Sequence, residues 1–522
     1  MGVDNPPGSA VKLIDRPGPT WRLVVTLALP VLAQQFLILS VGLSDRFLAG
    51  HLQPLPRQQQ AEALGHRLTA LGLGAAGLTS GSAASVLGAE ASWEAARQIE
   101  SQHIAYQSAQ TMAIYLGWMI SSFTVLVSVG STALVARFIG AGDHDAAVEV
   151  TNQSIMLAAA LGLLGTMLGL FGLDRFIALM QLQGHAAQFA AQYMRPLLWL
   201  LVFQVVESAG LACLVGAGDT RMNFYVLGGV AVLNFPLAWG LFLGWGPLPE
   251  LRFVGIALGT AISHALGGLA VFLVLRRGRA GLRLDWARFA PRWDLLWRIL
   301  RISIPAGIDS LTLMGGHLWF YSIVNRLGDA ASSAHGIALT WEALSFLSGA
   351  AFGTAATALV GQNLGAGRGA RAAHCGWVAF AIGSSIMAFM GAVFFIFAPE
   401  MFLLFCPHPE QRAIVEAGVP VLRLEAFAEP GLASLIIFLS ALRGAGDTRV
   451  PMLINCFGVL GVRVPLAYVF TMSHLDLGPL GMWPACNLGL FGAWMAMFAD
   501  LYVRGGFFLL RFASGRWQRV RV

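Results

Sequence analysis

The chain has 522 residues, of which 57% are hydrophobic and only 11% are charged, and its mean hydropathy is +0.68. Soluble proteins carry about 25% charged residues, so the composition excludes a soluble globular protein and indicates a protein that crosses a membrane several times. The net charge of +6 does not indicate nucleic-acid binding, because the basic residues lie between apolar runs and do not form one stripe.

In chain order, residues 1–19 are polar and rich in Pro and Gly, which predicts a disordered cytoplasmic leader. A membrane-spanning helix needs about 20 mostly apolar residues. Twelve later runs meet this requirement, and each is predicted to be one spanning helix. They lie at 20–50, 106–137, 147–172, 190–216, 220–245, 253–277, 296–326, 334–364, 370–398, 412–443, 449–471 and 488–513.

Arginines predict the orientation of these helices. The stretch 276–295 between helices six and seven contains six of them, and the tail 514–522 contains three more. Cytoplasmic loops of membrane proteins carry an excess of Lys and Arg. We therefore expect both termini and the 276–295 loop to face the cytoplasm in a plasma-membrane protein.

The string GAGDTR occurs at 216–221, after helix four, and again at 444–449, after helix ten. ARFIGAGD at 136–143 and GQNLGAGR at 361–368 follow helices two and eight at a similar offset of 225 residues. The prolines of helices one and seven, Pro30 and Pro305, are instead 275 residues apart. The difference of 50 residues predicts an insertion in the first half, at about 53–103, which the orientation places outside the cytoplasm.

The repeat indicates that a six-helix unit is duplicated. The predicted fold class is therefore an all-α membrane protein with twelve transmembrane helices in two pseudo-symmetric six-helix lobes. The N-lobe covers 20–275, a cytoplasmic loop covers 276–295, and the C-lobe covers 296–513. In each GAGDTR turn, we expect a glycine in the left-handed conformation and an Asp–Thr pair, Asp219–Thr220 or Asp447–Thr448, that can cap the next helix.

These motifs resemble those of the MATE (multidrug and toxic compound extrusion) family, in the order LALPVLAQQ and VGLSDRF in helix one, ALVARFIGAGD after helix two, and the two GAGDTR turns. Phe235, and not an aspartate, precedes Pro236 of helix five, so the resemblance is to the bacterial NorM-like branch. The resemblance implies a V-shaped pair of lobes that export organic cations or drugs by alternating access, in antiport with Na⁺ or H⁺.

Carboxylates inside the membrane are costly and are therefore candidates for ion coupling. Asp45 lies in the VGLSD context in which the family has a coupling aspartate. Asp309 of helix seven and Glu429 of helix ten each lie one turn before a family carboxylate position, so they are predicted to rebuild the second-lobe cation site. Glu425 shares a helical face with Glu429, but we expect it in water near the outer helix end.

Glu207 and Glu342 lie deep in apolar runs and, with Trp341 and His317, are candidates for the substrate cavity. Either carboxyl group can instead be protonated and bonded to a neighbouring helix, and the aromatic residues can simply pack. His317 is also a candidate for a proton relay with Asp309. Arg463 in helix eleven needs a partner, which we expect to be a carboxylate of helix seven or helix ten.

The sequence also limits the alternatives. It lacks a Walker A loop, a His-Glu-x-x-His motif and a Gly-x-Ser-x-Gly motif, so we expect no enzyme activity, no cofactor and no metal beyond a transported Na⁺. The expected partners are small organic cations and the lipid bilayer, with a monomeric protein and no nucleic acid. A flippase of lipid-linked precursors, which has a related architecture, is the alternative. The choice between Na⁺ and H⁺ stays open.

Overall fold

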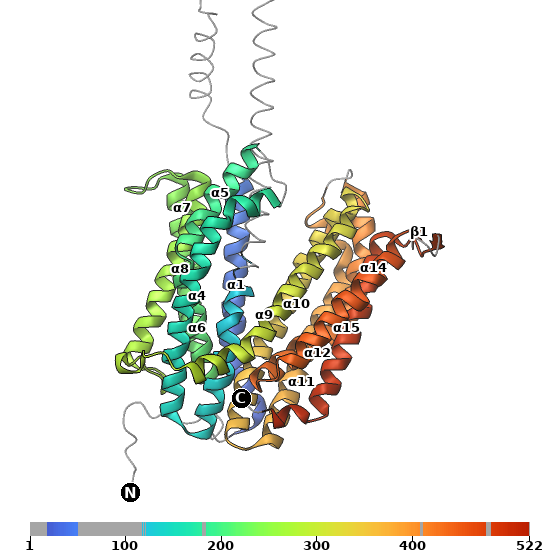
Figure 1. The fold of residues 1–522 in the computed structure, drawn as a ribbon. Helices are drawn as coiled ribbons and strands as arrows, with labels where there is room; N and C mark the ends of the chain where they lie inside the picture. Colours follow the sequence, from blue (N-terminus) through green and yellow to red (C-terminus); the bar gives the residue numbers. More distant parts are fainter. Residues whose placement is uncertain are drawn as a thin grey trace, which may run out of the picture.

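The computed structural model describes residues 18–50, 117, 120, 122–179, 184–407, 411–476 and 482–520. In this part the chain forms two helical lobes that meet at one end and diverge toward the other (Figure 1). We call the end where they meet the junction end. The leader 1–17 and the predicted insertion 53–103 lie outside the described residues.

The N-lobe contains six spans. They are α1 (Thr20–Gly50), the helix Ser122–Ala141, α4 (His144–Leu179), α5 (Gly184–Trp199) with α6 (Leu201–Gly216), α7 (Thr220–Leu243) and α8 (Arg252–Arg277). Helices α5 and α6 are bent by 54° relative to each other. Pro196 lies one turn before this break, and a proline inside a helix removes a backbone hydrogen bond and favours such a bend.

The C-lobe repeats this order. Its helices are α9 (Trp293–Asn325), α10 (Asp329–Gly365), α11 (Gly369–Leu403), α12 (Arg412–Gly444), α13 (Arg449–Cys456), a π-helical turn η4 (Phe457–Arg463), α14 (Val464–Thr471) and α15 (Gly489–Ala513). Strands β1 (His474–Asp476) and β2 (Met482–Pro484) pair antiparallel after α14, with Leu475 opposite Trp483. Two short 3₁₀ turns remain: η2 (Trp286–Arg288) lies between α8 and α9, and η6 (Arg516–Arg519) follows α15.

The twelve predicted helices are confirmed within the described residues. Ten helices are long and apolar enough to cross a membrane, and the bent pair α5 and α6 forms an eleventh span. Helix α9 coincides with the remaining predicted span, 296–326. The structure therefore has the fold class that the duplicated sequence predicts.

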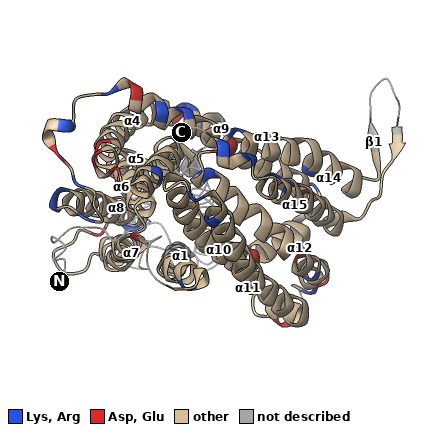
Figure 2. Cartoon of the chain, turned by 90° about the horizontal axis from the view of Figure 1, so that it is seen from below, with Lys and Arg blue, Asp and Glu red and all other residues tan. Residues whose placement is uncertain are grey.

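The first helix of each half packs into both lobes. Leu23, Val24 and Leu27 of α1 belong to the hydrophobic core of the C-lobe. Leu295 and Ile299 of α9 belong to the core of the N-lobe. Helix α1 accordingly lies between α7 and α10 (Figure 2), so the first helix of each half contributes to the core of the other half.

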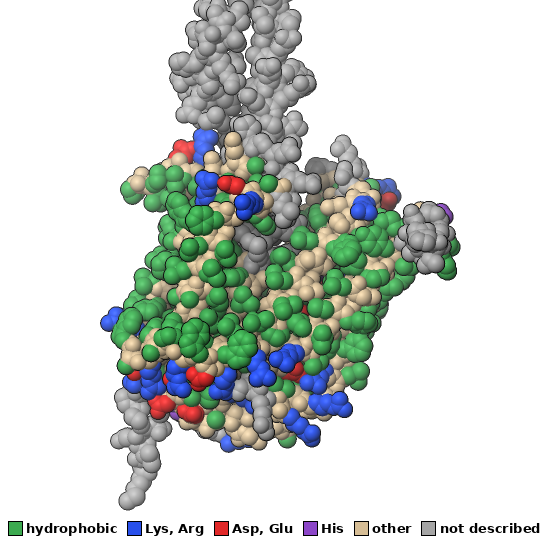
Figure 3. Space-filling view, viewed as in Figure 1, with side chains coloured by type: hydrophobic (Ala, Val, Ile, Leu, Met, Phe, Trp, Pro, Cys, Tyr) green, Lys and Arg blue, Asp and Glu red, His purple; other side chains and the backbone are tan. Residues whose placement is uncertain are grey.

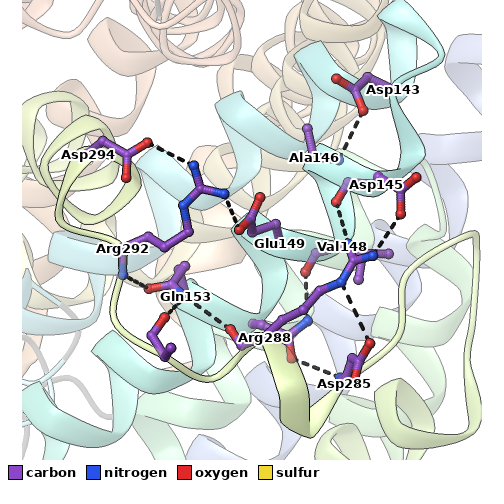
Figure 4. A network of polar contacts seen from close by, with 12 residues as sticks. Asp143, Asp145, Ala146, Val148, Glu149, Gln153, Asp285, Arg288, Arg292 and Asp294 are labelled. Carbon is purple, nitrogen blue, oxygen red and sulfur yellow. Dashed lines mark hydrogen bonds and ion pairs between the residues drawn. The ribbon is translucent and has the colours of Figure 1, made fainter.

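The loop between the lobes is attached to the N-lobe (Figure 4). Arg288 and Arg292 of the loop form ion pairs of 2.9 and 2.5 Å with Asp145 and Glu149 of α4. Gln153 of α4 donates a hydrogen bond of 2.8 Å to the carbonyl oxygen of Ala290. The hydrogen bond from Arg288 to Asp145 raises the pKa of the Arg288 guanidinium above its ordinary value. The loop is therefore a fixed part of the N-lobe surface.

Four turns with the sequence Gly-Ala-Gly lie at the junction end. Their last glycines, Gly142, Gly218, Gly367 and Gly446, have φ angles of 82°, 88°, 73° and 83°, a left-handed conformation that favours glycine. Arg side chains gather at the same end of the molecule (Figure 3). The predicted left-handed turns are thus confirmed, together with their position beside the positively charged surface.

The two predicted aspartate caps have different outcomes. Asp219 accepts a 3.0 Å hydrogen bond from the backbone N–H of Met222 and so caps α7, as predicted. In the second turn, the N-cap residue of α13 is Thr448 of the predicted Asp447–Thr448 pair, but no side chain makes a capping hydrogen bond there. The Asp447 carboxylate instead accepts hydrogen bonds of 2.9 and 2.7 Å from Arg511 of α15. Both aspartates thus bind an arginine, since Asp219 also accepts a 2.7 Å hydrogen bond from Arg279, but only Asp219 caps a helix as well.

Candidate functional site

Three glutamates lie inside the C-lobe, between α10 and α12. Glu429 is fully buried, and its Oε2 accepts a 2.5 Å hydrogen bond from the hydroxyl group of Ser345. A Cβ added at Gly391 of α11 would contact the Glu429 side chain at 3.0 Å. The Glu429 carboxyl group is therefore enclosed by three helices.

Glu425 and Glu342 accompany Glu429. Glu425 is only 1% exposed, so the prediction that it lies in water is wrong. Its carboxyl group is close enough to interact electrostatically with those of Glu342 and Glu429. Within the described residues, one oxygen of each of these three glutamates is buried without a hydrogen-bond partner. We refer to Glu342, Glu425 and Glu429 as the acid cluster.

Trp341 precedes Glu342 in the chain. Its indole ring packs edge-on against Phe405, with ring centroids 5.6 Å apart. Among the described residues, the Trp341 Nε1 donor has no hydrogen-bond partner. This residue therefore has the packing contact that the sequence analysis allowed and also a free donor next to the acid cluster.

Asp309 belongs to a different set of contacts. Its Oδ2 accepts a 2.7 Å hydrogen bond from Arg443 of α12, and its Oδ1 accepts one of 2.8 Å from Asn455 of α13. Asp309 is fully buried, and Arg443 is 21% exposed. The structure thus gives Asp309 a positive charge from within the chain and places it in a network separate from the contacts of Glu429.

Arg463 meets its carboxylate partner on α15. Its Nε donates to Asp500 at 2.8 Å, and Arg504 donates to the two oxygens of the same carboxylate at 2.7 and 2.6 Å. The prediction of a partner on helix seven or ten is therefore wrong. The π-helical turn η4 ends at Arg463, and the partner lies on the last helix because α15 packs beside this turn.

His317 connects this network to a more accessible surface. Its Nδ1 lies 2.7 Å from the carbonyl oxygen of Leu313, and its Nε2 lies 3.3 Å from Arg463. A carbonyl oxygen only accepts and a guanidinium group only donates, so His317 is neutral here, with its proton on Nδ1. The His317 side chain is exposed.

The two sets of charged groups form one chain of hydrogen bonds. Arg504 donates to Asn455 at 3.1 Å, and Asn455 donates to Asp309. The network therefore runs from Arg443 through Asp309, Asn455, Arg504 and Asp500 to Arg463 and His317. It contains three arginines and two aspartates, so its formal charge is +1 with His317 neutral.

The N-lobe has fewer charged side chains than the C-lobe at the positions that the internal repeat makes equivalent. Gln34 of α1 is the repeat equivalent of Asp309, because the two are 275 residues apart, as are the prolines of helices one and seven. Its contact is neutral, since Asn223 of α7 donates to Gln34 at 2.5 Å. Asn234 donates to Thr260 at 2.9 Å. Asp45 lies on α1, but its side chain falls outside the part that the structure describes.

Glu207 is the buried carboxyl group of this lobe. It is 2% exposed, and its Oε2 lies 2.7 Å from Nδ1 of His264 on α8. Its Oε1 has no hydrogen-bond partner among the described residues. The contact with a neighbouring helix is one of the two alternatives that the sequence analysis left open for Glu207.

Sequence reasoning missed four residues of the network: Arg443, Asn455, Asp500 and Arg504. Only the pair Asp500 and Arg504 carried a signal, because opposite charges four residues apart in an apolar run share a helical face. The other contacts join residues 37 to 146 positions apart. Such pairings follow from helix packing, which the sequence pattern does not define.

The acid cluster has the chemistry of a cation site. Each of its carboxyl groups can hold a proton, and ionised carboxylate oxygens are ligands for small cations such as Na⁺. A buried ionised carboxylate without a partner is costly. The occupancy of the cluster by a cation or by protons should therefore affect the stability of the surrounding helices.

The comparisons with known proteins agree with this architecture. The chain is 28% identical over 406 residues to the probable multidrug resistance protein NorM of Thermotoga maritima, an alignment that covers 77% of this chain and 83% of that protein. It is 31% identical over 304 residues to the multidrug resistance protein NorM of Burkholderia vietnamiensis, with 55% and 64% coverage.

Solved structures show the same fold. The outward-facing conformation of a multidrug resistance MATE family transporter matches with a TM-score of 0.78 and 19% identity, over 97% of this chain and 99% of that one. A sequence profile of the MatE family matches residues 102–239 and 305–469, which is more than half of the chain. The chain therefore belongs to the MatE family of membrane transporters.

Proposed function

We propose that this protein exports organic cations or drugs from the cytoplasm, in antiport with a cation that binds at the acid cluster. The observation that carries this proposal is the position of Glu342, Glu425 and Glu429, three carboxyl groups inside one lobe with free oxygens. The relatives named as multidrug resistance proteins support the substrate class. The junction end faces the cytoplasm, because the arginines gather there.

Transport proceeds by alternating access of the two lobes. In the outward-open state, Na⁺ or H⁺ binds at the acid cluster, with Glu429 as the central ligand. A ligand shifts such an equilibrium only through different affinities for the two states. Cation binding therefore favours release of the drug outside, and dissociation of the cation inside resets the transporter. Asp45 contributes a further coupling carboxylate in the N-lobe.

The substrate lies between the lobes, next to the C-lobe network. His317 is exposed, and we expect its ring, the aromatic face of Trp341 and the Glu342 carboxylate to contact the cationic ligand. Asp309 acts on coupling through the network and not as a direct cation ligand, because Arg443 and Asn455 already occupy both of its oxygens. Glu207 contributes a second protonatable group, paired with His264.

The contacts of the arginines favour a cationic substrate over a lipid-linked pyrophosphate. A flippase of such precursors needs free basic groups to bind the head group. Arg463 and Arg504 share Asp500, and Arg443 is paired with Asp309. These arginines already bind aspartates, whereas the glutamates retain free oxygens.

The test uses proteoliposomes that contain a fluorescent organic cation and a Na⁺ gradient or a pH gradient, imposed one at a time. We expect one of the two gradients to drive the coupling cation across the membrane in one direction and the dye in the opposite direction. Glu429→Gln should abolish this coupled movement, and Asp45→Asn should weaken it. Glu416→Gln is a matched control, because Glu416 lies on the same helix but is exposed and pairs with Arg412.

Two results would contradict the proposal. The first is the absence of gradient-driven dye movement in the correctly folded wild-type protein. The second is unchanged coupling in Glu429→Gln. Gradient-independent movement of a fluorescent lipid across the vesicle membrane would favour the flippase instead.

A further inference from the structure

The junction end contains a contact that is made twice, once from each lobe. Arg137 of the helix Ser122–Ala141 donates 3.0 Å hydrogen bonds to the carbonyl oxygens of Ala445 and Val520 in the C-lobe. Gln362 of α10 donates a 2.9 Å hydrogen bond to the carbonyl oxygen of Gly216 in the N-lobe. Arg137 and Gln362 are 225 positions apart, which is the offset of the internal repeat.

The backbones at this contact are close enough to require glycine. A Cβ added to Gly140 would overlap the carbonyl oxygen of Gln362, and a Cβ added to Gly365 would overlap that of Arg137. These two contacts are reciprocal. Gly140 of the N-lobe meets Gln362 of the C-lobe, and Gly365 of the C-lobe meets Arg137 of the N-lobe. The Gly-Ala-Gly turns therefore do more than end helices, because they allow the two lobes to touch through their main chains.

Within each lobe, the end of the helix that leads into the turn, α6 or α12, is held by a second repeated contact. Thr132 donates to the carbonyl oxygen of Ala212 at 3.0 Å, and Thr357 donates to that of Ser440 at 2.8 Å. The turn that receives the bond from the other lobe is thus fixed to its own lobe. An inter-lobe hydrogen bond at such a turn acts on the whole lobe and not on a loose loop.

The contact is buried, but its hydrogen-bonding groups are incompletely satisfied. Gln362 is 1% exposed. In the described part of the chain, Gln362 Oε1 and Arg137 Nε are buried without hydrogen-bond partners. Buried unpaired polar atoms reduce the stability of the closed arrangement. This combination suits a contact that must break in every cycle.

We propose that Arg137 and Gln362 form a two-sided latch that holds the lobes together at the junction end and is released when the transporter opens to the cytoplasm. The latch rests on the alternating-access function proposed above. Arg443, which binds Asp309, directly precedes the latch turn Gly444–Gly446. The chain of hydrogen bonds that runs from His317 to Arg443 therefore ends beside the Ala445 carbonyl oxygen, to which Arg137 donates.

The test measures the distance between the lobes at the junction end and does not depend on transport. Nitroxide labels are attached to His144→Cys and Ala370→Cys, which are exposed positions on α4 and α11. Cys456 and Cys486 are replaced by alanine, and the other three cysteines are buried. Electron–electron double resonance in lipid nanodiscs then gives the populations of closed and open junctions.

We expect Arg137→Ala to raise the open-to-closed ratio about tenfold or more, because it removes two charge-assisted hydrogen bonds, and Gln362→Ala to raise it about threefold. The double variant should be the most open. Arg137→Lys, which keeps the charge, should lie between Arg137→Ala and the wild type. Asn363→Ala and Arg511→Ala are matched controls, because Asn363 and Arg511 bond within the C-lobe, and they should leave the distances unchanged.

Wild-type distances in the folded double variant would overturn the latch. Equal opening in the two control variants would overturn it as well, since any loss of polar contacts would then open the junction. A latch that opens as expected, in a wild-type protein without gradient-driven transport, would support the latch and count against the proposed function.

Discussion

The two lobes are built from one repeated unit but differ in charge at equivalent positions. Where helix one meets helix five, the N-lobe has the neutral pair Gln34 and Asn223. Where helix seven meets helix eleven, the C-lobe has Asp309 bound by Asn455 and Arg443. The same packing therefore supports a neutral contact in one lobe and part of a charged network in the other. Within the described residues, the repeated frame therefore carries its buried charge networks mainly in the C-lobe.

The largest expected effect is a loss of stability when Asp500, the central aspartate of the network, is replaced. Asp500→Ala leaves Arg463 and Arg504 buried without their carboxylate, and an unpaired buried charge costs about 3–5 kcal/mol. Asn223→Ala removes a neutral hydrogen bond in the N-lobe and should cost about 1 kcal/mol. Unfolding in detergent, followed by intrinsic fluorescence, measures both. Equal losses in the two variants would contradict the contrast between the lobes.

The second expected effect tests whether the lobes are equivalent at the junction. Gly140→Ala and Gly365→Ala each place a Cβ against the backbone of the other lobe, and overpacking of this kind costs about 1–3 kcal/mol. We expect similar shifts in the unfolding transition for the two variants. Gly172→Ala in α4 is the control, because a Cβ there meets no atom within 4 Å. A large effect of one junction glycine alone would show that the symmetry is broken there.

The third expected effect compares the buried glutamates as coupling groups. Glu429→Gln should lower gradient-driven transport at least about tenfold, which corresponds to about 1.4 kcal/mol in the limiting barrier. Glu207→Gln should lower it less than about threefold, because Glu207 stands alone with His264. Initial rates in proteoliposomes measure both effects. A larger loss for Glu207→Gln would place the main coupling site in the N-lobe.

The smallest expected effect concerns the two copies of GAGDTR. Asp219→Ala removes the cap of α7 and should cost about 1 kcal/mol, whereas Asp219→Asn keeps a capping group and should be nearly neutral. Asp447→Ala should cost more, because it leaves Arg511 without its carboxylate. The same unfolding measurement ranks the three variants. A larger loss for Asp219→Ala than for Asp447→Ala would reverse the assigned roles.

The sequence by itself determined the number and order of the spanning helices, because apolar runs of membrane length have few other structures available in a bilayer. It also determined the duplication, since the motif order and the constant offset are visible in one dimension. The left-handed glycines of the Gly-Ala-Gly turns and the Asp219 cap were predictable, because these are local properties of the backbone.

Only the tertiary structure decided which charges meet. Arg463 binds Asp500 and not a carboxylate of helix seven or ten, and Glu425 is buried and not in water. Both outcomes depend on the rotation of each helix about its axis and on which helix packs beside it. The bonds of Arg137 to Ala445 and of Gln362 to Gly216 across the junction depend on the same packing. Helical periodicity gives the face of a residue on its own helix, whereas its partner is set by contacts between helices far apart in the sequence.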